Sequence, residues 1–211
     1  MNIAVFGARG RMGRKVVEIA EERGHSVWQI DKNWQENPLK TVDVAIDFAT
    51  ADATNEVCDF CKAHNSALVS GVTGRNEMQL QLLEELASIV PISCKANFSI
   101  GVNMLYELAE IISKKLSDWD CEIVEIHHRN KIDSPSGTAK QLASVIEKEN
   151  SFKKVTIHAL RAGTNSGCHS VVFASNGESL TLTHQAESRD IFARGAVLEA
   201  ERLVREGSRN K

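Results

Sequence analysis

The first hundred residues of this chain alternate between short β-prone runs and segments with helical periodicity. The β-prone runs are 3–6, 26–30, 42–48, 67–71 and 91–96. Between them, apolar residues recur at helical spacing, as at Val16, Val17, Ile19 and Ala20. Strands separated by helices predict a parallel sheet with right-handed crossovers. We therefore expect an α/β, Rossmann-like domain over residues 1–98.

The order of predicted helices and strands changes in the second half of the chain. A helix is predicted over 103–116, a strand over 121–128 and a helix over 139–149. Three β-prone runs then follow with little room for helices between them, at 155–162, 169–175 and 178–186. Such a meander predicts an antiparallel or mixed sheet, so we expect a smaller α+β domain over 99–187. The last segment, 188–211, is expected to form a helix that packs back on the first domain.

Composition narrows the class of protein. The formal net charge of −3 argues against a nucleic-acid-binding protein with a basic face. No apolar run reaches the roughly 18 residues of a membrane helix, and the first residues lack the pattern of a secretory signal. Five cysteines do not resemble a disulfide framework, so we expect a cytoplasmic protein. Cys58 and Cys61 form a C-x-x-C, which we interpret as buried, inert thiols on a helix rather than as a redox or metal site.

A glycine loop, GARGRMG (7–13), lies between the first strand and the first helix. Free backbone amides at such a helix start are suited to a pyrophosphate. The spacing G-x-x-G-x-x-G is only moderately specific, and it is not a Walker loop. Asp31 ends the second strand, where a carboxylate can accept hydrogen bonds from ribose hydroxyls. The predicted cofactor-binding residues here are Gly7, Ala8, Arg9, Gly10, Arg11, Met12, Asp31 and Lys32.

The choice between NADH and NADPH stays open. Asp31 favours a free 2′-hydroxyl and hence NAD, whereas Lys32, Arg9 and Arg11 can hold a 2′-phosphate or simply be surface charges. We expect NADH, NADPH or both.

Two further loops follow the fourth and fifth predicted strands, where open α/β sheets bind ligands. They are SGVTG (70–74) and KANFSIGVN (95–103). Their small residues permit close approach of the backbone to a ligand, and Phe98 is a candidate to flank a nicotinamide ring. The predicted cofactor-binding residues of these loops are Gly71, Val72, Thr73, Lys95, Ala96, Asn97 and Phe98.

The segment HHRNKIDSPSGT (127–138) carries the candidate chemistry. Ser136 is a credible N-cap, and the amides of Gly137 and Thr138 then form an anion site at the helix start, suited to a carboxylate or phosphate. His127, His128 and Lys131 precede it, and such side chains transfer protons near neutral pH.

Three other interpretations of these side chains stay open: surface residues, a metal ligand, or packing. Since neighbouring strand residues face opposite ways, at most one histidine is expected to transfer protons.

These motifs together resemble the dihydrodipicolinate reductase (4-hydroxy-tetrahydrodipicolinate reductase) family, in a short form. The resemblance rests on GARGRMG, VDVAIDFAT, GVTG, ANFSIGVN and, above all, the segment EIHHRNKIDSPSGTA (125–139). It also includes RAG-x3-G-x-H (161–169) and H-x-A-x-S-R-x-x-F-A-x-G-A (184–196). It implies a nicotinamide cofactor in the first domain, a small dicarboxylate substrate in the second, and a homotetramer built on the second domain's sheet.

The resemblance also implies roles for individual residues. His127 matches the family's proton donor or acceptor, and Lys131 matches its acid. The implied substrate-binding residues are His128, Ser136, Gly137, Thr138 and Thr73, the last shared with the cofactor. Most other members have a longer segment between Lys32 and Asp43, and a threonine is more usual at Val72. Rival interpretations are another Rossmann oxidoreductase and a dinucleotide sensor without catalysis.

Overall fold

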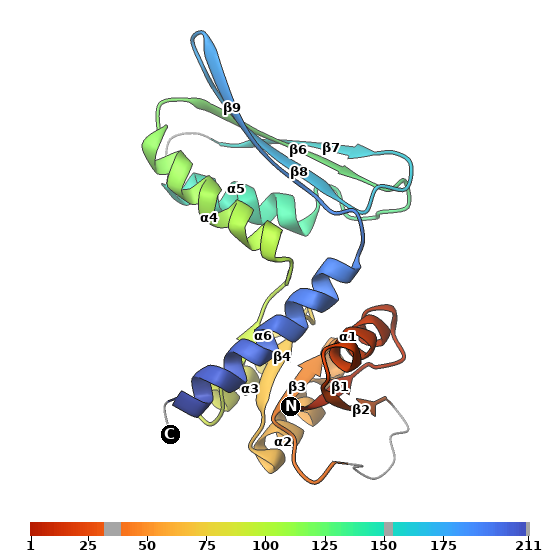
Figure 1. Cartoon of the computed structure of the whole chain (residues 1–211). Helices are drawn as coiled ribbons and strands as arrows, with labels where there is room; N and C mark the ends of the chain where they lie inside the picture. The colour runs from red at the N-terminus through yellow and green to blue at the C-terminus, as the bar shows by residue number, and fades with distance from the viewer. Residues whose placement is uncertain (32–38, 150–153, 210–211) are drawn as a thin grey trace. The chain divides into compact units, whose positions relative to one another are not determined.

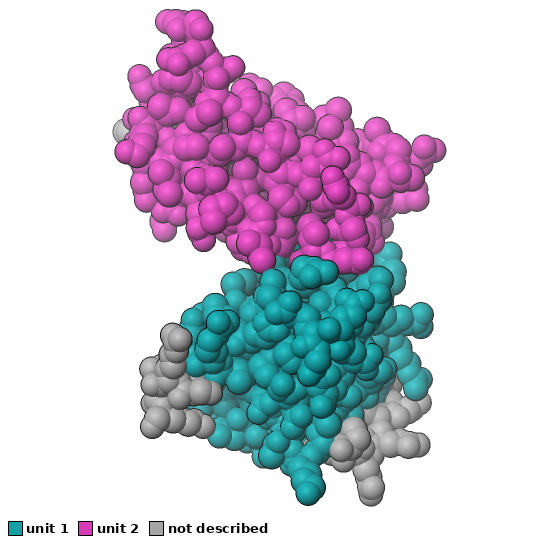
Figure 2. Space-filling model, in the orientation of Figure 1, with its two compact units in different colours: residues 1–98, 192–211 teal, residues 99–191 magenta. Residues whose placement is uncertain are grey.

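The computed structural model describes residues 1–31, 39–149 and 154–209, so Lys32 lies outside the described residues. The chain divides into two compact units (Figure 2), unit 1 with residues 1–98 and 192–211 and unit 2 with residues 99–191. Each unit contains its own sheet and its own apolar core.

The sheet of unit 1 is parallel throughout, which confirms the expected α/β fold. Its strands are β1 (Asn2–Phe6), β2 (Ser26–Ile30), β3 (Val44–Asp47), β4 (Ala67–Ser70) and β5 (Ile92–Cys94). They lie in the order β2-β1-β3-β4-β5. From β1 the chain passes to β2 on one side and then crosses back to β3 on the other side of β1, so the strand order reverses there. The gap between the carboxyl ends of β1 and β3 is therefore the topological switch point, where such sheets bind ligands.

Helices cover both faces of this sheet (Figure 1). The two on one face are α1 (Arg11–Glu22) and α6 (Asp190–Arg209), and those on the other are α2 (Thr54–His64) and α3 (Glu77–Ala87). A short 3-10 turn, η1 (Ala51–Ala53), precedes α2. Small residues let α6 approach closely, because a Cβ added at Gly195 would lie 1.8 Å from the Phe98 carbonyl oxygen. Ala193, Ala196 and Ala200 lie in the same core as Ile3 and Val44.

Unit 2 is a mixed sheet with two helices on one face (Figure 1). Its elements are α4 (Ile100–Lys115), β6 (Asp120–His127), α5 (Gly137–Glu149), β7 (Thr156–Arg161), β8 (Cys168–Ser175) and β9 (Glu178–Gln185). The strand order is β7-β6-β8-β9. The core lies between the helices and the sheet, with Leu105, Leu142, Ile123 and Phe173 inside it. Among the described residues of unit 2, no helix covers the opposite face of the sheet.

The predicted meander is only half correct. β8 and β9 form an antiparallel hairpin, but β7 does not pair with β8. Instead, β7 lies on the far side of β6 and runs parallel to it. The reason is α5, which carries the chain across the sheet between β6 and β7 and so makes a parallel crossover. β8 then returns antiparallel to β6 on its other edge.

The C-x-x-C lies on α2, and both thiols are buried in the core of unit 1. Burial raises the pKa of Cys61 to about 12 and raises that of Cys58 as well. Thiols with raised pKa values stay protonated at neutral pH and are poor nucleophiles. The predicted burial of this pair is confirmed.

Candidate active site

The glycine loop joins β1 to α1 at the switch point of unit 1. Gly7 has φ +70, and a Cβ there would lie 2.7 Å from the Phe48 carbonyl oxygen. A Cβ at Gly13 would lie 2.0 Å from the Gly7 carbonyl oxygen. Only glycine fits at these two positions. The N-cap of α1 is Gly10, and no side chain caps the helix. Its first amides are therefore available to an anionic ligand.

Two cavities open along the carboxyl ends of the strands of unit 1. The first, of about 350 Å³, lies at the ends of β1, β2 and β3 and includes Gly7, Gly10, Asp31 and Phe48. An Asp31 carboxylate oxygen accepts a hydrogen bond from the Arg9 amide at 3.1 Å, which holds it against the glycine loop. A bare-backbone helix start beside a carboxylate fits the pyrophosphate and ribose of a dinucleotide.

The second cavity, of about 290 Å³, shares Phe48 with the first. Its remaining lining is Met12, Gly71, Thr73, Ala96, Asn97, Phe98 and Phe192. The structure therefore brings the loops 70–74 and 95–98 together with the glycine loop, as the sequence suggested. Phe98 is buried, and its ring lies 6.3 Å from that of Phe48, so it forms part of a packed wall.

The other predicted cofactor residues lie around these cavities rather than in their lining. Ala8 is buried under the loop, whereas Arg9 and Arg11 are exposed. The Lys95 ammonium lies 2.9 Å from Glu199 of α6 and 5.9 Å from the centre of the Phe98 ring. The Val72 carbonyl accepts a hydrogen bond from Arg75.

Arg75 was not predicted, although it organises the loop after β4. Its guanidinium is buried and lies 3.0 Å from the Asp47 carboxylate, 2.7 Å from the Ser70 hydroxyl and 2.9 Å from the Val72 carbonyl. Thus one side chain ties the ends of β3 and β4 to the loop that lines the second cavity. Nothing in the sequence around Arg75 distinguishes it from a surface arginine.

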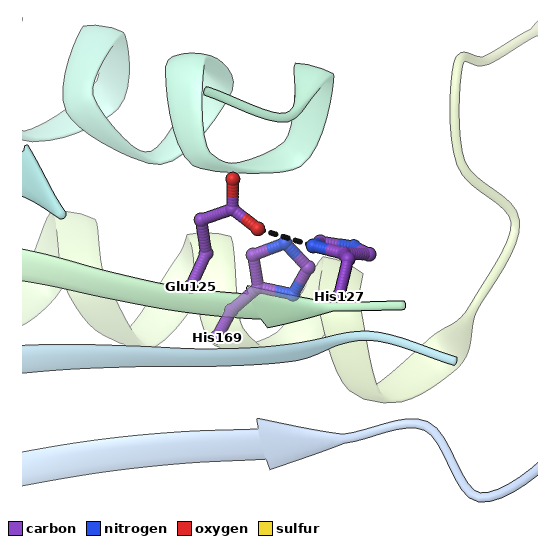
Figure 3. Close-up of side chains that lie close together, drawn as sticks. All are labelled: Glu125, His127 and His169. Carbon is purple, nitrogen blue, oxygen red and sulfur yellow. Dashed lines mark hydrogen bonds and ion pairs between the residues drawn. The ribbon is translucent and has the colours of Figure 1, made fainter. Parts of the chain in front are cut away.

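In unit 2, the centre of the candidate site is Glu125, which is fully buried on β6. Arg161 at the end of β7 donates to both carboxylate oxygens, at 2.7 and 3.0 Å. The Ser136 amide donates to Oε1 at 3.0 Å, and Nδ1 of His127 is hydrogen-bonded to Oε2 (Figure 3). Glu125 and His127 are two residues apart on one strand, so both point to the face that α4 and α5 cover.

His169 completes this cluster from β8. Its ring centre lies 5.0 Å from that of His127, and the rings are nearly perpendicular (Figure 3). Its Nε2 is 3.1 Å from the Ser136 hydroxyl, which accepts a hydrogen bond from the Ala139 amide at 3.2 Å. The predicted N-cap at Ser136 is therefore confirmed. Within the described residues, Nδ1 of His169 is buried without a hydrogen-bond partner.

Lys131 and the start of α5 lie next to this cluster in the chain. The Lys131 ammonium is 2.7 Å from Oδ1 of Asp133, and the Gly137 amide also donates to the Asp133 carboxylate. Gly137 is exposed, and a Cβ there would meet no atom within 4 Å. The Thr138 hydroxyl is hydrogen-bonded to Tyr106 of α4. The structure thus places an ammonium group and an open helix start around one carboxylate.

His128 follows the end of β6 and, unlike His127, does not join the buried cluster. Its amide donates to the Asn165 carbonyl at 2.8 Å, and its Nε2 lies 2.8 Å from the guanidinium of Arg189. The two histidines therefore have different surroundings, as strand alternation predicts. Arg189, Ser188 and Glu178 are exposed.

Burial and charge set the protonation of the cluster. Burial raises the pKa of Glu125, but hydrogen bonds from Arg161 and His127 outweigh it and leave the pKa below its usual value. Burial lowers the pKa of His127, with Lys131 and Arg161 acting in the same direction and Glu125 opposing them. Burial, together with the nearby His127, lowers the pKa of His169 to about 4. The cluster at neutral pH is an ionised carboxylate beside two neutral imidazoles.

Glu125, His127 and His169 are close enough together to suggest a metal site, since their ligand atoms lie within 4.8 Å of one another. However, Arg161 donates to both oxygens of Glu125. A guanidinium in that position competes with a cation for the same lone pairs and repels it. The contacts of Glu125 favour an ion-paired hydrogen-bond network over a metal centre.

The fold defines a class of protein: a Rossmann-type oxidoreductase with a second unit in which titratable side chains lie near an exposed helix start. Two family models, described as the N-terminus and the C-terminus of dihydrodipicolinate reductase, match residues 1–98 and 101–210. The chain belongs to the dihydrodipicolinate reductase family.

Curated relatives agree with this assignment. The chain is 39% identical to a 4-hydroxy-tetrahydrodipicolinate reductase of Thermosipho africanus, over 99% of this chain and 94% of the relative. It is 38% identical to the Zymomonas mobilis protein of the same name, over 95% and 90% of the two chains.

A solved structure with a similar fold is the dipicolinate-bound dihydrodipicolinate reductase from Paenisporosarcina sp. TG-14. It has a TM-score of 0.84 at 22% identity and covers 97% of this chain and 95% of its own. A myo-inositol dehydrogenase from Corynebacterium glutamicum has a TM-score of 0.60 at 12% identity, covering 98% and 89% of the two chains. At these identities both likenesses concern the fold alone.

Proposed function

We propose that this chain reduces 4-hydroxy-tetrahydrodipicolinate to tetrahydrodipicolinate with NADH or NADPH, in the diaminopimelate route of lysine biosynthesis. The observation that carries the proposal is the match of both family models, which together span nearly the whole chain. The two units support it, because unit 1 has the glycine loop of a dinucleotide site and unit 2 has acid–base groups beside an anion site.

NAD(P)H, when bound, supplies the hydride of this reaction. The residues that hold it are the glycine loop 7–12 and Asp31, together with Gly71, Val72, Thr73 and the segment 95–98. The uncapped amides of α1 suit the pyrophosphate, and Asp31 suits a ribose hydroxyl. Because Asp31 accompanies the exposed cations Arg9 and Arg11, we propose that both NADH and NADPH are used.

The substrate is a cyclic dicarboxylate, so its recognition requires donors and positive charge. The Gly137 amide at the exposed start of α5 binds one carboxylate, together with Thr138 and Ser136, and Thr73 also contacts the substrate. His128, which lies beside Arg189, contributes a polar contact. These roles follow the chemistry of helix starts, where amides and the helix dipole favour an anion.

The conversion replaces the ring hydroxyl by hydrogen: the hydroxyl leaves as water and a hydride enters the conjugated ring. The negative charge that the hydride leaves on the ring must be neutralised by a proton. We assign this proton to Lys131, acting with His127. Lys131 is partly buried, and its ammonium carries a transferable proton. His127 is neutral near pH 7, because burial lowers its pKa, and can relay a proton or return one to Lys131.

Nicotinamide absorbance tests the proposed function. The substrate is prepared fresh with dihydrodipicolinate synthase, and NADH and NADPH are assayed in parallel. We expect oxidation of the cofactor that depends on this substrate. Binding of both cofactors without any turnover would instead identify a dinucleotide sensor. Turnover with amino or hydroxy acids alone would identify another Rossmann oxidoreductase.

We also propose that the chain forms a homotetramer through the sheet of unit 2 and functions in the cytoplasm. The face of this sheet opposite α4 and α5 presents Val124, Ile126, Leu160 and Val172, and Leu160 is 44% exposed. This face also carries the exposed ion pair of Glu122 and His158, and no helix of the described residues covers it. Exposed apolar side chains on such a face are suited to self-association. Leu160→Asp is expected to lower the mass measured by analytical ultracentrifugation, whereas a wild-type monomer would contradict the proposal. No helix of the described residues is long and apolar enough to cross a membrane.

A further inference from the structure

We propose that Glu125 is the positioning residue of this site, holding His127 in the tautomer that carries its proton on Nδ1 and leaves Nε2 free on the Gly167 side. The proposal deepens the proposed function and rests on it for the catalytic consequence. Glu125 was not among the residues predicted from the sequence.

His127 has two ring nitrogens, and either can carry the proton of the neutral ring. A neutral imidazole has one N–H, and the partner of one ring nitrogen decides the state of the other. Nδ1 of His127 faces a carboxylate oxygen of Glu125, which only accepts hydrogen bonds when ionised. Hydrogen bonds, chiefly from Arg161, keep the pKa of that carboxyl below its usual value. Nδ1 must therefore donate, and Nε2 carries the lone pair.

Gly167 lies next to Nε2 of His127. A Cβ at residue 167 would lie 3.0 Å from Nε2 of His127, so any larger residue there would press against this nitrogen. Gly167 also has φ +145, a region that L side chains rarely adopt. Glycine at position 167 thus keeps free the space beside Nε2 that a side chain would fill, whereas Nδ1 is turned to the buried carboxylate.

The negative charge of Glu125 affects the pKa of His127. A lone carboxylate beside a histidine raises its pKa and favours the imidazolium. Here Arg161 donates to both oxygens of Glu125 and neutralises the negative charge. Glu125 therefore orients His127 without forcing it into the charged form. The same carboxylate accepts the Ser136 amide, which links the orientation of His127 to the start of α5, where the substrate carboxylate is proposed to bind.

Nitrogen NMR of the wild-type protein tests the tautomer directly. Long-range ¹H–¹⁵N correlation of ¹⁵N-histidine-labelled protein, above pH 7, distinguishes a protonated Nδ1 from a protonated Nε2. The signals of His127 are assigned by their loss in His127→Gln. We expect the proton on Nδ1. A proton on Nε2 overturns the proposal, whatever the activity of the enzyme.

Glu125→Gln tests the catalytic consequence. The amide can donate to Nδ1, so we expect a population with the proton on Nε2 and a fall in kcat of about tenfold to a hundredfold. The limb of the pH–rate profile that belongs to His127 should move to lower pH, because the carboxylate that raises its pKa is gone. The Kd of NADH should stay unchanged. A purely structural role would lower stability without moving the tautomer or the pH profile.

Glu110→Gln is the matched control. Glu110 lies on α4 of the same unit, is 46% exposed and pairs with Lys114. This control should leave kcat and the histidine spectrum unchanged. If Glu125→Gln does not fold, Glu125→Asp keeps the charge for Arg161 but withdraws the carboxylate from Nδ1. Normal kcat in either folded variant overturns the proposal.

The proposed tautomer of His127 and the proposed reaction can be refuted independently. A wild-type enzyme that shows the Nδ1 proton but does not reduce the substrate would refute the proposed function and support the orientation by Glu125. A reductase with the proton on Nε2 would do the reverse.

Discussion

The ammonium nitrogen of Lys131 lies 2.7 Å from Oδ1 of Asp133, and the amide of Gly137 donates to the same carboxylate. The Asp133 carboxylate thus occupies two of the groups that we assign to the substrate and its proton transfer. A substrate carboxylate that binds at the start of α5 must replace Asp133 there, and this replacement also separates Lys131 from its ion-pair partner.

Asp133→Asn is therefore expected to lower the KM for substrate. Asp133 is 51% exposed, and an exposed ion pair contributes about 0.2–1 kcal/mol. Removal of this competition should lower KM by up to about fivefold. The inhibition constant of dipicolinate, measured as a dicarboxylate probe, should fall by a similar factor. Asp59→Asn on α2, an exposed aspartate of unit 1, serves as the control. A raised KM would indicate that Asp133 supports binding instead.

The buried pair of Arg75 and Asp47 gives a prediction for stability. Arg75→Met leaves the Asp47 carboxylate buried without its ion-pair partner, which typically costs about 3–5 kcal/mol. Burial already raises the pKa of Asp47, and loss of Arg75 should raise it further. We expect a lower urea midpoint for the variant and weaker NADH binding, because Arg75 also holds the loop at Val72.

A double variant separates the charge from the packing. Arg75→Met with Asp47→Asn removes the unpaired charge, so it should recover part of the stability lost in Arg75→Met. If the single variant unfolds at the wild-type urea concentration, the pair does not stabilise the end of the sheet as argued.

His169 should make folding stability depend on pH. Its pKa is lowered to about 4 by burial and by His127, whereas an unfolded histidine titrates near 6.5. Between these values the unfolded chain binds more protons, so stability falls as pH decreases from about 6.5 to about 4. The full loss is on the order of 3 kcal/mol. His127 and His184 have pKa values lowered in the same direction and add to this slope.

Urea unfolding at a series of pH values measures this dependence. His169→Gln should flatten the slope between about pH 6.5 and 4, since glutamine does not titrate and can keep the hydrogen bond to Ser136. His158→Gln on β7, a half-exposed histidine, is the matched control for the loss of a histidine from unit 2. An equal slope in His169→Gln and wild type would contradict the assignment.

The inner strands β1, β3 and β4 of unit 1 were predictable because each is a short apolar run buried on both faces. The strand that pairs with β7 was not predictable from the sequence. Neighbours along the chain usually pair, but β7 pairs in parallel with β6, across the crossover helix predicted at 139–149, instead of forming a hairpin with β8.

The candidate site was predictable where its residues are adjacent in sequence. The segment 127–138 contains the histidines, the lysine and the helix start together. Glu125, Arg161 and His169 were not identified as one cluster, because they come from three strands and meet only through the sheet register. One signal was present, since Glu125 is a carboxylate on the inward side of a strand between Ile123 and His127. A buried charge requires partners.

The most direct test of the central claim is the steady-state kcat of Lys131→Ala and of His127→Ala with fresh substrate and saturating NADH. The account predicts a fall of about a hundredfold or more in each variant, the scale of lost acid catalysis. The Kd of NADH should match that of the wild type, because the residues proposed to bind it belong to unit 1. A near-normal kcat in either variant would contradict the assigned proton transfer.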